Sequence, residues 1–356
     1  MKNKIKEVEV TILFILGSLI LFWSCRENST SNVILNPQIQ KFSKFPNNSI
    51  GDVVHLKSAI LSEPEFMIYY DSMLLFTFYY PKTDLIGAYL LGREEYKPII
   101  LTGRGPNEGI SAAGIGINTN INELWFYDDI QKNISFVPFA KIFDNRQKIT
   151  HKEQIPDDSY WNIEMLNDSL YLAFASMNYP EKKITIFNPY THKVVNRVGE
   201  YYKTNGCPIK GVSEVFFASI KAKPGGDRFV CAYKKTDVIE IYNASGSLIH
   251  SVQGPDCFSA NFKIDAITAT HVKYHAIGVN LKAYNCLNTT SKYIYGLFNS
   301  RYIHVFDWNG NPIKRITLSS DLEEQISSFC VDNQNLQLYF YSKTYGRICK
   351  INLLLN

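Results

Sequence analysis

The stretch DVIEIYNASGSLIHSVQG, residues 237–254, decides the fold of this 356-residue chain. It holds two runs of β-forming residues separated by Asn-Ala-Ser-Gly, and this order is typical of a β-hairpin with its turn. The same order recurs in KKITIFNPYTHKVVNRVG (182–199) and YIHVFDWNGNPIKRITL (302–318). Three such hairpins at comparable spacing favour a repeated β architecture over a sandwich.

Short β-rich segments bounded by turn residues continue along the whole chain. Six of them are MLLFTFYY (73–80), ELWFYDD (123–129), SLYLAFAS (169–176), RFVCAY (228–233), YIYGLF (293–298) and LQLYFYS (336–342). Their first apolar positions lie 45 to 64 residues apart, which is the range of β-propeller blades. The sequence therefore predicts an all-β chain in which residues 46–356 form a six-bladed propeller of four-stranded antiparallel blades.

The two ends of the propeller segment complement each other. The last unit, Ile326 to Leu355, lacks an outermost strand, and the β-rich stretch IGDVVHLK (50–57) is otherwise unassigned. We expect this stretch to join the last blade and close the ring, because closure protects sheet edges that would otherwise be open to pairing.

The first residues have the features of an export signal. Lys2, Lys4 and Lys6 precede an uncharged run from Val10 to Trp23, which is followed by Ser24 and Cys25. A membrane-spanning helix needs about 20 apolar residues, and this run is shorter. We therefore predict a lipoprotein signal peptide (1–24), a lipidated Cys25 and a membrane-proximal linker (25–45). The alternative is an uncleaved signal anchor with an unmodified Cys25.

Composition narrows the classes of partner. Only 20% of the residues are charged and the net charge is +4, so nothing indicates nucleic-acid binding. The six cysteines that follow Cys25 form no CxxC motif. In an exported protein they could form disulfides, in any of 15 pairings, or remain buried free thiols.

The stretch LTGRGPNEG (101–109) resembles a phosphate-binding loop but fails the test for one. No lysine follows Gly109, and a dinucleotide-binding motif would need glycine where Glu108 stands. The loop falls between the first two β-units, where Gly103, Gly105 and Pro106 suit a turn. We expect a crossover between blades. Arg104 and Glu108 either bind a ligand or stabilise the turn.

The motif GRGPNE (103–108), the lipoprotein-like signal and six β-units together resemble the TolB-like six-bladed propeller lipoproteins of Bacteroidetes-type bacteria. The resemblance covers roughly residues 45–356. It implies a cell-envelope protein attached to the outer membrane and implies no particular activity. The tract after Cys25, CRENSTSN, lacks an acidic surface-export signal, which favours the periplasmic face.

Motifs for chemistry are sparse. His271 and His275 have the spacing of helical zinc ligands but lie in a strand-like segment, so we expect no metal site there and no cofactor. Neither HExxH nor a GxSxG elbow occurs. Ser72 and Ser169 lie in Asp-Ser-hydrophobic triplets, which resemble acceptors for O-glycosylation and also suit hairpin turns.

Two functions remain open at this stage, besides a purely structural scaffold in a larger outer-membrane assembly, which differs from the first only in the stability of its partner. The first is a non-enzymatic envelope lipoprotein whose propeller binds a protein, peptide or glycan. The second is a hydrolase or lyase that acts on a polysaccharide or small metabolite, with its residues gathered at the central channel from several blades. The lack of a linear catalytic motif favours the binding module, although a site built from several blades would leave no such motif.

Overall fold

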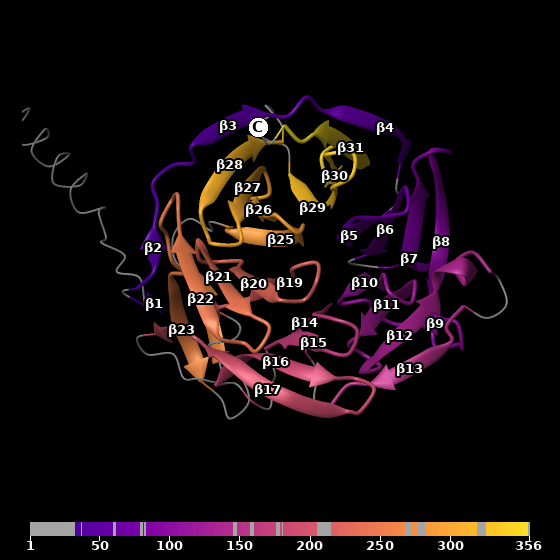
Figure 1. Ribbon diagram of the computed structural model, residues 1–356, viewed down its shortest axis with the longest axis horizontal. Coiled ribbons are helices and arrows are strands. Elements are labelled where there is room, and N and C mark those ends of the chain that lie inside the picture. Colours follow the sequence, from indigo (N-terminus) through magenta and orange to yellow (C-terminus); the bar gives the residue numbers. More distant parts are fainter. Residues whose placement is uncertain are drawn as a thin grey trace, which may run out of the picture.

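The structure is a computed structural model that describes residues 33–36, 38–59, 62–78, 81, 83–144, 148–156, 160–175, 179, 181–204, 215–267, 272–276, 282–318 and 325–354. The signal segment and Cys25 therefore lie outside the described residues. Six β-sheets stand around a central axis like the blades of a propeller (Figure 1), which confirms the all-β, six-bladed prediction. Among the elements whose bounds lie in the described residues, the helical one is a 3-10 turn, η1 (Phe139–Lys141).

The first three blades follow one another along the chain. Blade 1 contains β5 (Pro64–Tyr70), β6 (Met73–Phe78), β7 (Asp84–Leu90), β8 (Glu95–Thr102) and β9 (Glu108–Gly109). Blade 2 contains β10 (Ile115–Asn118), β11 (Glu123–Asp128), β12 (Asn133–Pro138) and β13 (His151–Gln154). Blade 3 contains β14 (Asn162–Met165), β15 (Tyr171–Phe174), β16 (Lys182–Asn188) and β17 (Lys193–Glu200).

The other three blades each include a strand from near the N-terminus. Blade 4 contains β19 (Ala218–Ala222), β20 (Arg228–Tyr233), β21 (Val238–Asn243), β22 (Leu248–Gln253) and β2 (Gln40–Lys41). Blade 5 contains β25 (Tyr284–Thr289), β26 (Tyr293–Phe298), β27 (Tyr302–Asp307), β28 (Pro312–Thr317) and β3 (Asn47–Ile50). Blade 6 contains β29 (Ile326–Asp332), β30 (Gln337–Ser342), β31 (Arg347–Asn352) and β4 (Val54–Ala59).

Two small sheets complete the described strands. β1 (Val33–Ile34) pairs with β18 (Lys203–Thr204), and β23 (Phe262–Ile267) pairs with β24 (Val272–Ala276). The five-stranded blades 1, 4 and 5 depart from the four-stranded expectation, because each carries an added outer strand that runs parallel to its neighbour.

The middle strands of each blade are buried on both faces because neighbouring blades cover them. In β11 the consecutive residues Trp125, Phe126 and Tyr127 are all at most 1% exposed. This double burial explains why the sequence shows near-continuous apolar and aromatic runs rather than a clean alternation. The first strand of each blade lies nearest the axis, and these innermost strands are β5, β10, β14, β19, β25 and β29 (Figure 1).

A segment of the chain that we call the strap, residues 33–36 and 38–59, runs along the outside of blades 4, 5 and 6 (Figure 1). The stretch expected to close the ring, 50–57, is divided between two blades. Ile50 belongs to β3 and pairs in parallel with β28 of blade 5, whereas β4 pairs antiparallel with β31 of blade 6. The divided pairing ties the strap to two blades, which a single closing strand would not do.

Aromatic side chains anchor the strap between β2 and β3. Phe45 is 3% exposed, and its ring lies 4.5 Å from that of His304 and 5.5 Å from that of Phe306, both on β27. Phe42 lies 5.0 Å from Phe45 and also contacts Phe306. Aromatic residues bury a large apolar area, so this cluster fixes the strap to blade 5.

We expect Phe45→Ala to lower the free energy of unfolding by about 3 kcal/mol, because it removes a buried aromatic ring and leaves a cavity. Urea denaturation followed by tyrosine and tryptophan fluorescence measures the change. Phe143→Ala is the matched control, since Phe143 is 41% exposed, and it should change the stability little. Equal effects of the two substitutions would mean that the strap is not packed on blade 5.

Candidate functional site

The GRGPNE loop connects β8 to β9 and is held by its own side chains. The Glu108 carboxylate accepts a hydrogen bond from the Gly105 N–H at 2.7 Å, and the Gly103 N–H donates to the Gly109 carbonyl at 2.8 Å. A Cβ atom on Gly103 would lie 2.0 Å from Glu108 Oε2. Glycine at 103 therefore leaves room for the carboxylate that stabilises the turn, and Pro106 and Arg104 lie exposed on the same loop.

The same loop joins blade 1 to blade 2. Asn107 Oδ1 accepts hydrogen bonds from the backbone N–H groups of Lys148 and Ile149, at 2.9 and 3.2 Å. Directly after the loop, the Ile110 N–H donates to Asp128 Oδ2 at 2.7 Å. These contacts give Glu108 and Asn107 a structural role at the crossover. Among the described residues, no contact of Arg104 indicates that it binds a ligand.

The other residues singled out in the sequence lie apart from one another. Ser72 and Ser169 are exposed in the turns that follow the innermost strands β5 and β14. Asp71 and Ser72 both have positive φ, as a two-residue hairpin turn requires, and Ser169 N–H and Oγ both bond to Asn167 Oδ1. Both serines therefore lie in hairpin turns, as expected, and their glycosylation stays a prediction.

His271 and Cys207 lie outside the described residues. His275 is on β24, a strand, so the helical spacing of zinc ligands does not arise there. Across the described part of the chain, no three His, Cys, Asp or Glu side chains gather as metal ligands would. The described cysteines are all free thiols: Cys231, Cys257, Cys286, Cys330 and Cys349. In the described ranges no helix has the length and apolar character needed to cross a bilayer.

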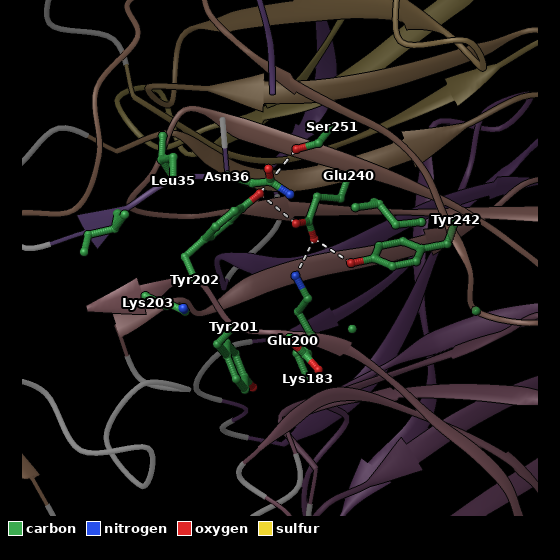
Figure 2. Close-up of a pocket in the computed structure, with 14 residues that line it drawn as sticks. Leu35, Asn36, Lys183, Glu200, Tyr201, Tyr202, Lys203, Glu240, Tyr242 and Ser251 are labelled. Atoms are coloured by element: carbon green, nitrogen blue, oxygen red, sulfur yellow. Dashed lines mark hydrogen bonds and ion pairs between the residues drawn. The ribbon is translucent and has the colours of Figure 1, made fainter. Parts of the chain in front are cut away.

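A pocket that the sequence analysis did not foresee lies between blades 3 and 4. This interblade pocket has a volume of about 520 Å³, within the usual range for small-molecule sites. Figure 2 shows that its side chains come from the strap, from β16 and β17 of blade 3 and from β21 and β22 of blade 4. Its lining is Ile34, Leu35, Asn36, Lys183, Gly199, Glu200, Tyr201, Tyr202, Lys203, Glu240, Tyr242, Gly246, Leu248 and Ser251.

A buried ion pair forms the floor of this pocket. Lys183 Nζ and Glu240 Oε2 are 2.5 Å apart, and their side chains are 1% and 3% exposed. Tyr233 and Tyr242 donate to the same carboxylate oxygen, at 2.8 and 2.7 Å. Tyr202 donates to the other oxygen, Oε1, at 2.7 Å, as Figure 2 shows. We call these five side chains the Glu240 network.

The pKa values of Glu240 and of the three tyrosines in the network move away from neutrality. Burial by itself would raise the pKa of Glu240, but the Lys183 ammonium and the hydrogen bonds to the carboxylate hold it below its usual range. Burial raises the pKa of Tyr202, Tyr233 and Tyr242, and the charge of Glu240 raises them further. General acid–base catalysis needs a pKa near the working pH. These phenols and this carboxylate are instead fixed in one protonation state, which suits binding.

A second pocket, of about 440 Å³, opens among the ends of the innermost strands. We call it the channel pocket. Its lining includes Met165 at the end of β14, Ala222 at the end of β19 and Thr289 at the end of β25. Glu164 lines it too and lies 2.6 Å from Lys221 Nζ. Burial raises the pKa of Glu164, while Lys221 opposes the change.

Glu65 is a separate titratable group, at the beginning of the innermost strand β5. Burial raises its pKa to about 7, and the charge of Asp129 acts in the same direction, whereas Lys234 lowers it. The acid is therefore partly protonated at neutral pH. Asp237 behaves alike, with a pKa raised to about 7 by burial, although the N–H groups of Asp256 and Cys257 donate to it.

The sequence analysis could not predict that the residues of the Glu240 network come together. Lys183 and Glu240 lie on different blades, 57 residues apart, and each sits in an ordinary β-rich run. Their one signal is a charged residue inside a buried strand: Ile239 and Ile241 flank Glu240, and Ile184 follows Lys183. A charge in such a position needs a partner.

We expect Glu108→Ala to lower the free energy of unfolding by about 1–2 kcal/mol, because the Gly105 N–H loses a charged acceptor. Chemical denaturation measures it. Arg104→Ala is the control from the same loop and should change stability by less than about 0.5 kcal/mol, since Arg104 is exposed. If Arg104→Ala were the more damaging of the two, the turn would not depend on Glu108.

The raised pKa of Glu65 predicts a pH dependence of stability. The folded state holds the proton more tightly than the unfolded chain, so the stabilisation is complete below the unfolded pKa of 4.5 and is lost as pH rises through about 7. Glu65→Gln removes this loss. We expect the variant to match the native protein at pH 4.5 and to exceed its unfolding free energy by up to about 3 kcal/mol at pH 8.

Urea denaturation at both pH values tests this. Glu63→Gln is the control, because Glu63 is 43% exposed in its pair with Lys343. An unchanged pH profile in Glu65→Gln would show that Glu65 is solvated.

No curated protein matches this chain significantly. Among solved structures, Raptor of Chaetomium thermophilum is 11% identical, with a TM-score of 0.49 over 87% of this chain and 29% of that chain. The Cps50 (Swd1) β-propeller domain of Myceliophteria thermophila is 10% identical, with a TM-score of 0.46 over 85% of this chain and 99% of that one. Kuenenia stuttgartiensis hydrazine synthase is 11% identical, with a TM-score of 0.47 over 85% and 99%. The chain spans less than a third of the length of Raptor, and none of these likenesses carries a functional argument.

A family model, unlike these structures, shows to which family the chain belongs. The model described as "TolB-like 6-blade propeller-like" matches residues 41–334, which covers most of the chain and all six blades in part or whole. The ring of six sheets agrees with that description. The chain belongs to the TolB-like six-bladed propeller family.

Proposed function

We propose that this protein is a binding module anchored to the outer membrane by lipid on Cys25, with its propeller presented to a protein, peptide or glycan ligand. The observation that carries the binding role is the Glu240 network at the floor of the interblade pocket. Removing an ion pair from water costs free energy that its mutual attraction often fails to recover. Apolar side chains would join two blades at least as well, so the network is better explained by a ligand than by stability.

The anchor would keep the propeller close to the membrane. Seven residues, 26–32, separate Cys25 from Val33, where β1 of the strap begins to pair with β18. Even fully extended, such a tether reaches about 28 Å. Two or three acyl chains on Cys25 would supply enough buried methylenes for stable attachment. The uncharged run before Cys25 and its short length support this arrangement, and the periplasmic face remains the favoured location.

The enzyme alternative is not favoured. In the interblade pocket, the pKa of Glu240 is lowered and that of Tyr202 is raised, so each keeps one charge state near neutral pH. Glu65, which titrates near neutrality, lies at the start of β5 and lines neither pocket. A propeller that binds and presents a ligand fits these features more directly.

Replacing Cys25 by Ala should release the protein from the membrane fraction, because the acylated residue is lost. Fractionation of cells that express each form, followed by immunoblotting, measures the distribution. Ser24→Ala is a matched control, since it keeps a small residue before the cysteine, and it should remain membrane-bound. Retention of the Cys25→Ala form would indicate an uncleaved signal anchor.

Crosslinking of intact envelopes, followed by pull-down of the protein, tests binding. Recovery of no partner above an unrelated lipoprotein would contradict the binding role.

A further inference from the structure

We infer that the interblade pocket binds a small, neutral, hydroxyl-rich molecule, a sugar or polyol, and that the strap forms one wall of this site. The inference rests on the proposed binding role and adds to it the place and the chemical class of the ligand. Three properties of the pocket lead to it: its walls, its charge balance and its remaining hydrogen-bonding capacity.

The walls come from three parts of the chain. The strap contributes Leu35 and Asn36, blade 3 contributes the end of β17 and Tyr202, and blade 4 contributes Leu248 and Ser251. The strap is held there because β1 pairs with β18, directly after Tyr202. Without this pairing the pocket would lose a side. The site is therefore complete only in a protein whose strap is in place.

Close packing at Gly199 brings the backbone of blade 3 against the Glu240 network. Gly199 has φ +73°, and a Cβ atom there would lie 2.7 Å from Lys183 Cε and 3.2 Å from the Tyr242 hydroxyl. The backbone of blade 3 can thus pass directly over the lysine stem, as only glycine permits. The end of β17 therefore lies directly beside the polar floor, and both line the pocket.

The charge balance selects a neutral ligand. Lys183 and Glu240 neutralise each other at the floor, and Glu200, 3.2 Å from Lys182, and Lys203 bring the lining to two positive and two negative side chains. A ligand with a net charge would meet no unpaired charge of the opposite sign on the floor. It would still lose its hydration, and burying an unpaired charge is expensive.

The hydrogen-bonding groups suit hydroxyls. Glu240 Oε2 accepts three bonds, from Lys183, Tyr233 and Tyr242, but Oε1 accepts just one from the described residues, that of Tyr202. A carboxylate oxygen has two lone pairs, so Oε1 can accept again. The Ser251 hydroxyl, 3.3 Å from that of Tyr202, can donate or accept.

Asn36 completes the set. Its Oδ1 accepts the Gln38 N–H at 2.9 Å, which leaves its amide N–H groups for donation. A ligand hydroxyl can satisfy an acceptor and a donor at once, while the C–H faces of a sugar ring would contact Leu35 and Leu248. A sugar carries both hydroxyl groups and C–H faces, and the pocket offers both polar and aliphatic side chains to contact them.

The test is isothermal titration calorimetry of the purified full chain with D-glucose, N-acetyl-D-glucosamine and myo-inositol. We expect saturable binding of at least one of them, with a dissociation constant of about a millimolar or tighter. Ser251→Ala and Asn36→Ala should each weaken it about fivefold or more, because each loses one hydrogen bond. Ser49→Ala, on β3 of the strap and away from the pocket, is the matched control and should bind as the native protein does.

Thermal melting of each variant shows that it is folded. The inference is overturned if none of the three compounds saturates at about ten millimolar, or if Ser251→Ala and Asn36→Ala bind as tightly as the control. Stronger binding of glucose 6-phosphate than of glucose would contradict the charge argument. If sugars fail to bind but envelope crosslinking still recovers a partner, the binding module stands and this site assignment falls. If both experiments fail, both proposals fall.

Discussion

The pairing of β4 with β31 is the constraint on which the rest of the structure depends. The C-terminal blade has three strands of its own and takes its outermost strand from the beginning of the domain. A propeller closed in this way makes its two chain ends mutually dependent, because β4 pairs with the edge of β31 that would otherwise be open. It also fixes where the chain must travel before it enters blade 1, because the residues before β4 have to reach blade 6 from β1, which pairs with β18.

The route taken by those residues links the closure to the pocket. The strap passes blades 4 and 5 on its way to blade 6 and adds a parallel outer strand to each of them. Its first described residues, Val33 and Ile34, pair beside Tyr202, so that Leu35 and Asn36 become part of the interblade pocket. One segment thus closes the ring, covers two sheet edges and completes a candidate site. A tether attached to Cys25 would enter the fold at this point.

The six-bladed architecture could be predicted from the sequence because the strands and turns of each blade are specified by residues close together in the chain. Hairpins such as DVIEIYNASGSLIHSVQG carry their turn residues, and buried strands such as ELWFYDD carry aromatic runs. The GRGPNE loop was recognisable since Gly103 and Glu108 act within six residues of each other. The Glu240 network could not be anticipated, because Lys183 and Glu240 meet only when two blades pack. The division of 50–57 between blades 5 and 6 was equally hidden, since β-propensity does not specify a partner strand.

Native-state hydrogen exchange of the strap tests this account most directly. Amides of β3 and β4 that bond to β28 and β31 should exchange as slowly as those of the middle strands of blades 5 and 6, because opening the strap would open the ring. Amides at exposed turns such as Asp71–Ser72 serve as the fast reference. Exchange of β3 and β4 at the rate of these turns, with the blades still protected, would show that the strap is an appendage, and the closure and the completed pocket would both be contradicted.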